Sequence, residues 1–146
     1  MATSADTEAG EPRLTEREVE LVKEGYRAFE RGDLEWVLEH FHPEILVENR
    51  VEAPDSATFH GHSGFLRYLE GWLSAWEEFR MEPRDFIVEK DQVLVLLRQY
   101  ARGKGSTVEM VEDVAHLWTV RDEQAVAYRV YTHQADALRA IGVKRS

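Results

Sequence analysis

The stretch that decides the fold is YRAFERGDL at residues 26–34, followed by FHPE at residues 41–44. Gly32 supplies the left-handed backbone conformation that ends many helices, and Asp33 is a favourable cap for a second, short helix. Pro43 cannot continue that second helix, because it lacks a backbone N–H. The stretch therefore predicts two consecutive helices and then a strand over residues 44–51.

The residues before this stretch predict where the first helix begins. Thr15 followed by Glu18 is a capping box, in which each side chain accepts a hydrogen bond from the other residue's backbone N–H. Apolar residues then recur at spacings of three and four, the period of an amphipathic helix: Val19, Val22, Tyr26 and Phe29. The stretch 1–13 is small and acidic with few apolar residues, and we expect it to be a disordered tail.

The residues after this stretch predict one more helix and then mainly strands. A polar loop over residues 52–62 leads into a helix from about Ser63 to about Phe79, whose apolar stripe is broad and aromatic: Phe65, Leu69, Trp72, Trp76 and Phe79. The following strands are joined by short turns, which favour antiparallel neighbours: residues 84–89, 92–102, 107–121 and 125–133. A helical turn over residues 136–141 ends the pattern. Helices first and strands last predict one α+β domain over residues 14–142.

Composition excludes several functional classes. The chain of 146 residues has no cysteine and a formal net charge of −10. We therefore expect no disulfide or thiolate chemistry, and no nucleic-acid binding, which needs a basic stripe. The sequence contains no apolar run of the roughly 20 residues needed to cross a membrane, no phosphate-binding glycine loop and no convincing metal-ligand spacing. We expect a cytoplasmic protein without cofactor or metal.

The predicted strands carry apolar residues on both faces. Leu94, Val95, Leu96 and Leu97 run without interruption, and Trp118 lies next to Leu117. The predicted helices cover one face of the sheet, and no further helix is expected to cover the other. A second copy of the chain is the simplest cover, so we expect a homodimer through the outer face of the sheet.

The order of these elements resembles the nuclear transport factor 2-like superfamily over residues 14–142. The entry at residues 26–44 is similar to that of its polyketide-cyclase-like (SnoaL-like) members, as are residues 119–122, 129–131 and 137–142. The resemblance implies a cone-shaped, curved antiparallel sheet with three helices packed on its concave face. It also implies a pocket for a small hydrophobic molecule between helices and sheet. Family members include isomerases, cyclases, dehydratases, epoxide hydrolases and proteins that only bind, so function has to be argued from the site.

The residues of the steroid isomerases in this superfamily are not matched here. Those enzymes combine an aspartate base with a tyrosine and a neutral carboxylic acid. Aligned on Gly32-Asp33, the base position falls on Asn49, the tyrosine position on Gly25 and the acid position near Ala115. An amide has no titratable carboxylate and cannot act as the base. We do not expect isomerisation by that mechanism.

The same alignment, with strand alternation, selects the candidate site residues. It turns Arg98, Tyr100 and Asp113 inward, and we predict that they are catalytic. A charge pair beside a cavity can hold a water or bind a carboxylate; alternatively, Arg98 and Asp113 form only a structural cross-strand ion pair. The predicted ligand-binding residues are mainly aromatic: Tyr26, Asn49, Trp72, Trp76 and Tyr128.

Two alternatives remain open from the sequence. Glu112, His116 and Trp118 share the opposite strand face, where we expect a dimer-interface cluster. If the strand faces are reversed, Glu112 and His116 become the acid–base pair, since histidine titrates near neutral pH. His60 lies before the third helix, at the expected pocket mouth, and is either catalytic or solvated. The predicted function is a cofactor-free acid–base enzyme acting on a small hydrophobic substrate. The alternative is a non-catalytic ligand-binding or protein-interaction module.

Overall fold

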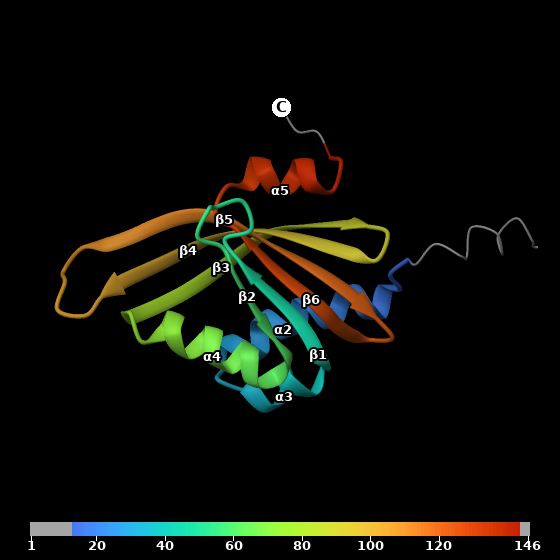
Figure 1. The fold of residues 1–146 in the computed structure, drawn as a ribbon, viewed down its shortest axis with the longest axis horizontal. Coiled ribbons are helices and arrows are strands. Elements are labelled where there is room, and N and C mark those ends of the chain that lie inside the picture. Colours follow the sequence, from blue (N-terminus) through green and yellow to red (C-terminus); the bar gives the residue numbers. More distant parts are fainter. Residues whose placement is uncertain (1–12, 144–146) are drawn as a thin grey trace, which may run out of the picture.

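Six strands form one curved, unclosed sheet in the computed structural model of the chain, which describes residues 13–143. Figure 1 shows the sheet arching over helices on one side, with the helix nearest the C-terminus on its opposite side. The strands are β1 (Phe41–Asn49), β2 (Ala57–His60), β3 (Trp76–Glu89), β4 (Gln92–Gly103), β5 (Glu109–Arg121) and β6 (Gln124–Tyr131), in the order β2-β1-β6-β5-β4-β3. The helices are α2 (Glu16–Glu30), α3 (Leu34–Glu39), α4 (Gly61–Leu73) and α5 (Gln134–Ala140). The predicted α+β fold is confirmed. The predicted tail, apart from Arg13, lies outside the described residues.

The start of α2 forms as its sequence predicts. The Glu18 backbone N–H donates to Thr15 Oγ1 at 3.1 Å, and the Thr15 N–H donates to Glu18 Oε1 at 3.0 Å. The second carboxylate oxygen of Glu18 accepts a hydrogen bond from the Glu123 N–H at 2.9 Å, in the turn between β5 and β6. One buried side chain therefore caps the helix and also ties it to the sheet. Gly32 adopts a φ of 77° after the helix, as expected for a left-handed stop.

Three element boundaries differ from the sequence-based expectation. The helix expected to reach Phe79 ends at Leu73, and residues 76–89 form one long strand instead. The polar loop over residues 52–62 contains the short strand β2. Pro43 lies inside β1, in a stretch where β1 has no paired residue, so its missing N–H breaks no ladder bond.

The sheet is not wholly antiparallel. β1 pairs with β6 in parallel, with Val47 opposite Tyr128, whereas every other pair of neighbouring strands is antiparallel. Short turns connect only the last four strands, so only these strands were expected from their turns to pair in antiparallel fashion. β1 and β6 are joined by most of the domain, which leaves room for a parallel arrangement.

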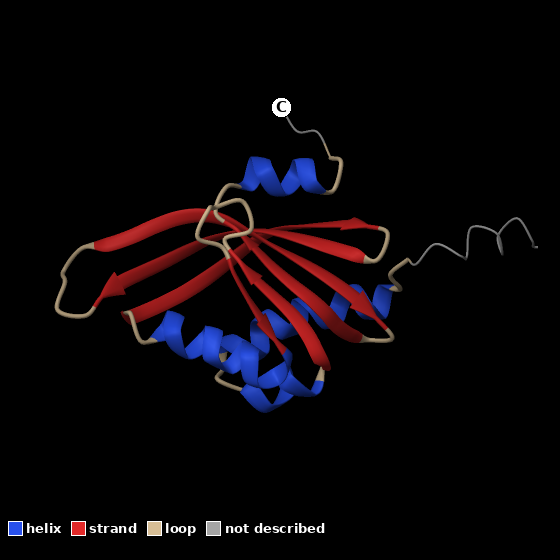
Figure 2. Ribbon diagram, viewed as in Figure 1, coloured by secondary structure: helices blue, strands red, loops and turns tan. Residues whose placement is uncertain are grey.

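Helices cover both faces of the sheet. Figure 2 shows α2, α3 and α4 on one side and α5 alone on the other. On the outer side, Leu138 and Ile141 pack against a buried cluster drawn mainly from β4 and β5: Leu94, Leu96, Ala115, Leu117, Tyr131 and Ala137. The expectation that no helix remained for the outer face was therefore wrong, because the predicted helical turn at the C-terminal end supplies part of the cover.

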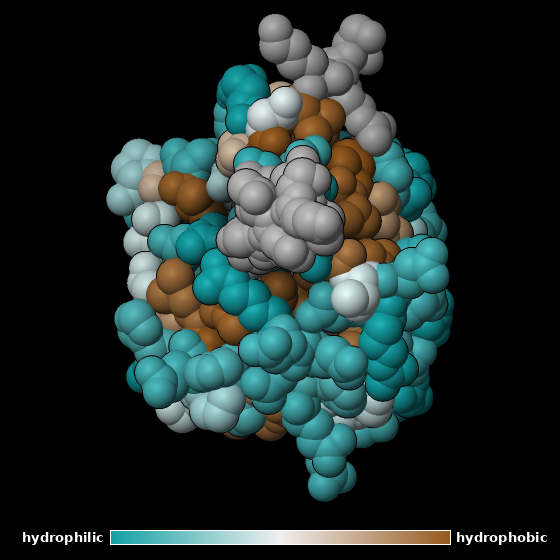
Figure 3. Space-filling view, turned by 90° about the vertical axis from the view of Figure 1, so that its right-hand side faces the viewer, coloured by the Kyte–Doolittle hydropathy of each residue, from teal (hydrophilic) through white to brown (hydrophobic). Residues whose placement is uncertain are grey.

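The surface combines hydrophilic residues with small apolar areas. Figure 3 shows apolar side chains gathered among hydrophilic ones at the end of the molecule where the β3–β4 and β5–β6 turns lie. Apolar residues are also exposed at the start of β5: Val108, Met110 and Val111. Among residues 13–143, no helix is long and apolar enough to cross a membrane.

The two edges of the sheet are β2 and β3. β3 has an irregularity between Pro83 and Asp85 in its pairing with β4. Charged residues surround it, including Glu82 and Arg84, which form an ion pair. Proline and charge on an edge strand oppose pairing with another chain.

We predict that Glu18→Ala lowers the free energy of unfolding by about 2 kcal/mol, because it removes the cap and leaves the Glu123 N–H without its partner. Urea denaturation measures this change. The control is Glu16→Ala, an exposed first-turn glutamate, which should change stability by less than about 0.5 kcal/mol. Equal effects of the two substitutions would contradict the double role of Glu18.

The homodimer remains a prediction, which now concerns the part of the outer face that α5 leaves open. Val111 is 50% exposed, and we predict that Val111→Lys weakens self-association. Light scattering at tens of micromolar should detect a dimer of the wild type. The matched control is Leu66→Lys, at an exposed apolar residue of α4 on the helical side. A monomeric wild type would refute the dimer.

Candidate functional site

A cavity of about 160 Å³ lies between the helices and the concave face of the sheet. Its walls come from α2, α3 and α4 on one side and from all strands except β2 on the other. Ten of the lining side chains are aromatic: Tyr26, Phe29, Trp36, Phe41, Phe65, Tyr68, Trp72, Phe79, Trp118 and Tyr128. Apolar walls with a few convergent polar groups are typical of small-molecule sites.

The polar centre of the cavity is a chain of four side chains. The Trp118 indole N–H donates to the Tyr26 hydroxyl at 2.8 Å. That hydroxyl lies 2.7 Å from His116 Nδ1, and His116 Nε2 lies 3.3 Å from the Tyr128 hydroxyl. Both imidazole nitrogens are therefore occupied by tyrosines. The ring of His116 also stacks on Tyr26 and meets Tyr128 edge-on.

Neighbouring elements bring these residues together for simple reasons. Tyr26 lies on the apolar stripe of α2, so its side chain points toward the sheet. His116 and Trp118 are two residues apart on β5 and share one face of that strand. Trp118 lies directly opposite Tyr128 on β6, and their rings stack at 4.3 Å between centroids. The chain thus joins one helix to two adjacent strands.

Burial sets the charge state of these hydrogen-bonded side chains. His116 is 3% exposed, and this burial lowers its pKa to about 3. The pKa values of Tyr26 and Tyr128 are raised above their ordinary range, again chiefly by burial. At neutral pH the imidazole is therefore neutral and both hydroxyls keep their protons.

The number of protons limits the hydrogen bonds that these neutral side chains can make. Trp118, Tyr26, His116 and Tyr128 carry four N–H or O–H protons, and three contacts join them. Each contact uses one proton, so one tyrosine O–H is always left without a partner in the chain. With the proton on Nε2 it is the O–H of Tyr128; with the proton on Nδ1 it is that of Tyr26. Tyr68 is hydrogen-bonded to Tyr128 as well, and this fifth residue adds one proton and one contact, so one tyrosine O–H is still left over for the cavity.

A second group of polar residues lies at the end of the cavity away from the β5–β6 turn. Gln99 is buried, and its amide donates to Glu112 Oε1 at 3.3 Å. Asn49 and Thr132 line the same cavity from the ends of β1 and β6. Glu112 is exposed and lies four residues from His116 on one strand, a separation of about 13 Å. These two residues share a face, but they do not form the direct acid–base pair considered from the sequence.

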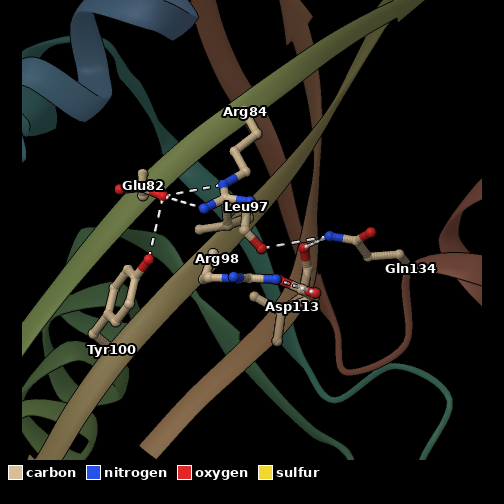
Figure 4. A network of polar contacts seen from close by, with 8 residues as sticks. Glu82, Arg84, Leu97, Arg98, Tyr100, Asp113 and Gln134 are labelled. Carbon is tan, nitrogen blue, oxygen red and sulfur yellow. Dashed lines mark hydrogen bonds and ion pairs between the residues drawn. The ribbon is translucent and has the colours of Figure 1, made fainter.

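The predicted catalytic residues are not in the cavity. Figure 4 shows Arg98 facing Asp113, with Gln134 of α5 nearby, and Tyr100 bonded to Glu82. The Arg98 guanidinium donates to both carboxylate oxygens of Asp113, at 2.8 and 3.1 Å. This hydrogen bonding lowers the pKa of Asp113. Both residues lie on the outer face, so their predicted inward orientation was wrong; their arrangement matches the structural cross-strand pair.

The inward face of β4 was predicted wrongly because its residues do not alternate between apolar and polar. Residues 93–97 are all buried, since α2 packs on Val93, Val95 and Leu97 while α5 packs on the other face. The family alignment then chose the face, and an offset of one residue reverses every side chain of a strand. The amphipathic pattern of residues 137–141 was the signal for a covered outer face.

The predicted ligand-binding residues fall into two groups. Tyr26, Asn49, Trp72 and Tyr128 line the cavity, and their role in binding stays a prediction. Trp76 does not line it, because it begins β3 instead of continuing the helix. The rings of Trp72 and Trp76 still meet, at 5.7 Å between centroids.

The remaining candidates contribute no site. His60 ends β2, is exposed and does not line the cavity. Within residues 13–143, no group of three or more histidine, aspartate or glutamate side chains is placed to hold a metal ion. Of the alternatives considered from the sequence, His116 is the one that lies at the polar centre.

Comparison with known proteins identifies relatives of the chain. The family model described as a SnoaL-like domain matches residues 22–128. An NTF2-like protein of unknown function from Burkholderia pseudomallei has a similar structure, with a TM-score of 0.72 and 22% identity over 88% of this chain and 100% of that chain. No curated protein matches.

Two further solved structures share the fold. TerC, co-crystallised with polyporic acid, has a TM-score of 0.68 and 23% identity over 85% of this chain and 96% of that chain. A putative SnoaL-like polyketide cyclase from a Jannaschia species has a TM-score of 0.68 and 18% identity over 88% of this chain and 93% of that chain.

We predict that His116 makes the protein less stable at acid pH. The folded protein takes up this proton only near pH 3, whereas the unfolded chain takes it up near the ordinary value of 6.5. The unfolded state therefore binds more protons between these values, and stability falls as the pH falls through that window. Between about pH 6 and pH 4, wild type should lose about 1.4 kcal/mol per pH unit more than His116→Gln.

Urea denaturation across this pH range measures the difference. His133→Gln, at an exposed histidine outside the cavity, is the matched control and should follow the wild type. If His116→Gln and wild type lose stability in parallel, the histidine is not held neutral.

Proposed function

Because the chain belongs to the SnoaL-like domain family, we propose that it binds a small, flat, largely apolar ring compound and transforms it by acid–base chemistry without a cofactor. The observation that carries this proposal is the Tyr26–His116–Tyr128 chain inside an aromatic cavity. The group of polyketide-cyclase-like proteins supplies the general class; the residues named here supply the chemistry.

The size of the cavity supports a compact ligand. Drug-sized ligands occupy pockets of about 300–1,000 Å³, whereas an apolar cavity of about 150 Å³ is known to hold benzene. At about 160 Å³, this cavity suits one substituted ring. The aromatic walls favour a flat ligand, because ring faces and edges pack well on one another.

The unused hydroxyl proton supports a ligand with an oxygen acceptor. A fixed tyrosine donor in a water-poor site stabilises negative charge that develops on a carbonyl oxygen. The raised pKa values of Tyr26 and Tyr128 keep these donors protonated across the physiological range. The site is therefore suited to reactions that pass through an enol or enolate.

The alternative is a non-catalytic ligand-binding module, and one observation favours it. None of the glutamates lining the cavity is hydrogen-bonded to the central chain. Glu112 bonds Gln99, whereas Glu18 is engaged by the backbone of Thr15 and Glu123. A reaction that needs a strong carboxylate base has no such base beside His116.

We predict that acetophenone binds about fivefold more tightly than α-methylstyrene, because the two have similar shape but only the ketone accepts a hydrogen bond. NMR titration, following the Trp118 indole N–H, measures both affinities. Tyr128→Phe should reduce the difference.

Arg98→Gln is the control, since Arg98 lies on the outer face. It should leave both affinities unchanged. Loss of binding in this variant would indicate that the ligand binds at the outer-face residues predicted from the sequence, and not in the cavity. Absence of binding by either compound to wild type would refute the proposed cavity ligand.

A further inference from the structure

We propose that the Tyr26–His116–Tyr128 chain is a tautomer switch, and that the substrates are small ring compounds whose oxygen alternates between carbonyl and hydroxyl. The inference rests on the proposed function and names its substrate class. It follows from the way in which both imidazole nitrogens are occupied by groups that can donate or accept.

With the proton on Nε2, the site fits a carbonyl. The Tyr26 oxygen accepts a hydrogen bond from the Trp118 N–H, and the Tyr26 O–H donates to Nδ1. Nε2–H donates to the Tyr128 oxygen. The O–H of Tyr128 is then not used by His116 and can donate to the neighbouring Tyr68 hydroxyl or to a ligand acceptor. The 2.7 Å separation between the Tyr26 oxygen and Nδ1 is compatible with a hydroxyl donor.

With the proton on Nδ1, the same site fits a hydroxyl. Tyr128 now donates to Nε2, so its oxygen can accept a hydrogen bond from a ligand O–H. Tyr26 accepts from both Trp118 and Nδ1–H, and its own O–H becomes the free donor. One shift of the imidazole proton thus converts Tyr128 from donor to acceptor without creating a charge.

The two states are linked by a balanced proton transfer. Starting from Nε2–H, Tyr128 gives its proton to the ligand carbonyl oxygen, and Nε2 replaces that proton. Nδ1 takes the proton of Tyr26, and the Tyr26 oxygen takes one from a carbon of the ligand. The C–H electron pair forms the new C=C bond as the C=O π pair becomes the O–H bond. After the product leaves, water bound at both hydroxyls takes part in the reverse proton transfers and returns His116 to the form protonated on Nε2.

A charged imidazole would defeat this device. It would donate from both nitrogens and leave both tyrosines as donors, so the site would no longer fit a ligand hydroxyl at Tyr128. Burial of His116 among aromatic rings disfavours that form, in agreement with its lowered pKa.

The test is NMR of 15N-histidine-labelled protein, because nitrogen shifts distinguish a protonated ring nitrogen from a bare one. The probes are acetophenone, which only accepts a hydrogen bond, and indole, whose N–H only donates. At saturation, acetophenone should give His116 protonated on Nε2, and indole should give it protonated on Nδ1. The same tautomer with both bound probes, or an imidazolium, would overturn the switch.

Two variants make the result specific. In Tyr128→Phe, both probes should give one and the same tautomer, since the phenylalanine can neither donate nor accept. Arg98→Gln lies on the outer face, away from the cavity, and should keep the wild-type response. If the probes bind but the tautomer does not respond, the switch fails while the proposed cavity function stands. If neither probe binds to wild type, both fail.

Discussion

The structure depends on the requirement that polar groups enclosed among aromatic rings must satisfy one another. Tyr26 brings a hydroxyl from α2 onto the sheet, where it meets the Trp118 indole and the His116 imidazole. An unpaired group at this depth costs about 1–3 kcal/mol. These hydrogen bonds favour the docking position of α2 in which the three groups meet. The same matching fixes the rings of β5 and β6 that form the cavity floor.

Much of the fold could be predicted, because several of its signals are local. The capping box at Thr15 and Glu18 and the stop at Gly32 depend on residues within one turn. The boundary between α4 and β3 could not be read in this way. Trp72, Trp76 and Phe79 have helical spacing, yet their rings meet across a turn between a helix and a strand. Periodicity alone does not distinguish these two ways of bringing aromatic rings together.

The site could be predicted only in part, because it depends on which face of each strand points inward. Tyr26 and Tyr128 were selected from helical periodicity and from β6, where the expected face lines the cavity. On β4 and β5 both faces are apolar, and the pattern contains no information about direction. Paired charges such as Arg98 and Asp113 suggest chemistry in a sequence, whereas burial holds His116 neutral. A buried neutral histidine has no distinctive pattern in a sequence.

The parallel pairing of β1 with β6 has a consequence for how the chain is made. Residues near 47 find their strand partners near 128, so this part of the core cannot form until the later strands exist. A ribosome produces α2, α3 and β1 first, and their apolar faces must wait for the strands on which they pack. Contacts between residues so distant in sequence also slow folding. The aromatic surface that later lines the cavity is thus exposed during synthesis, when chaperones can recognise it.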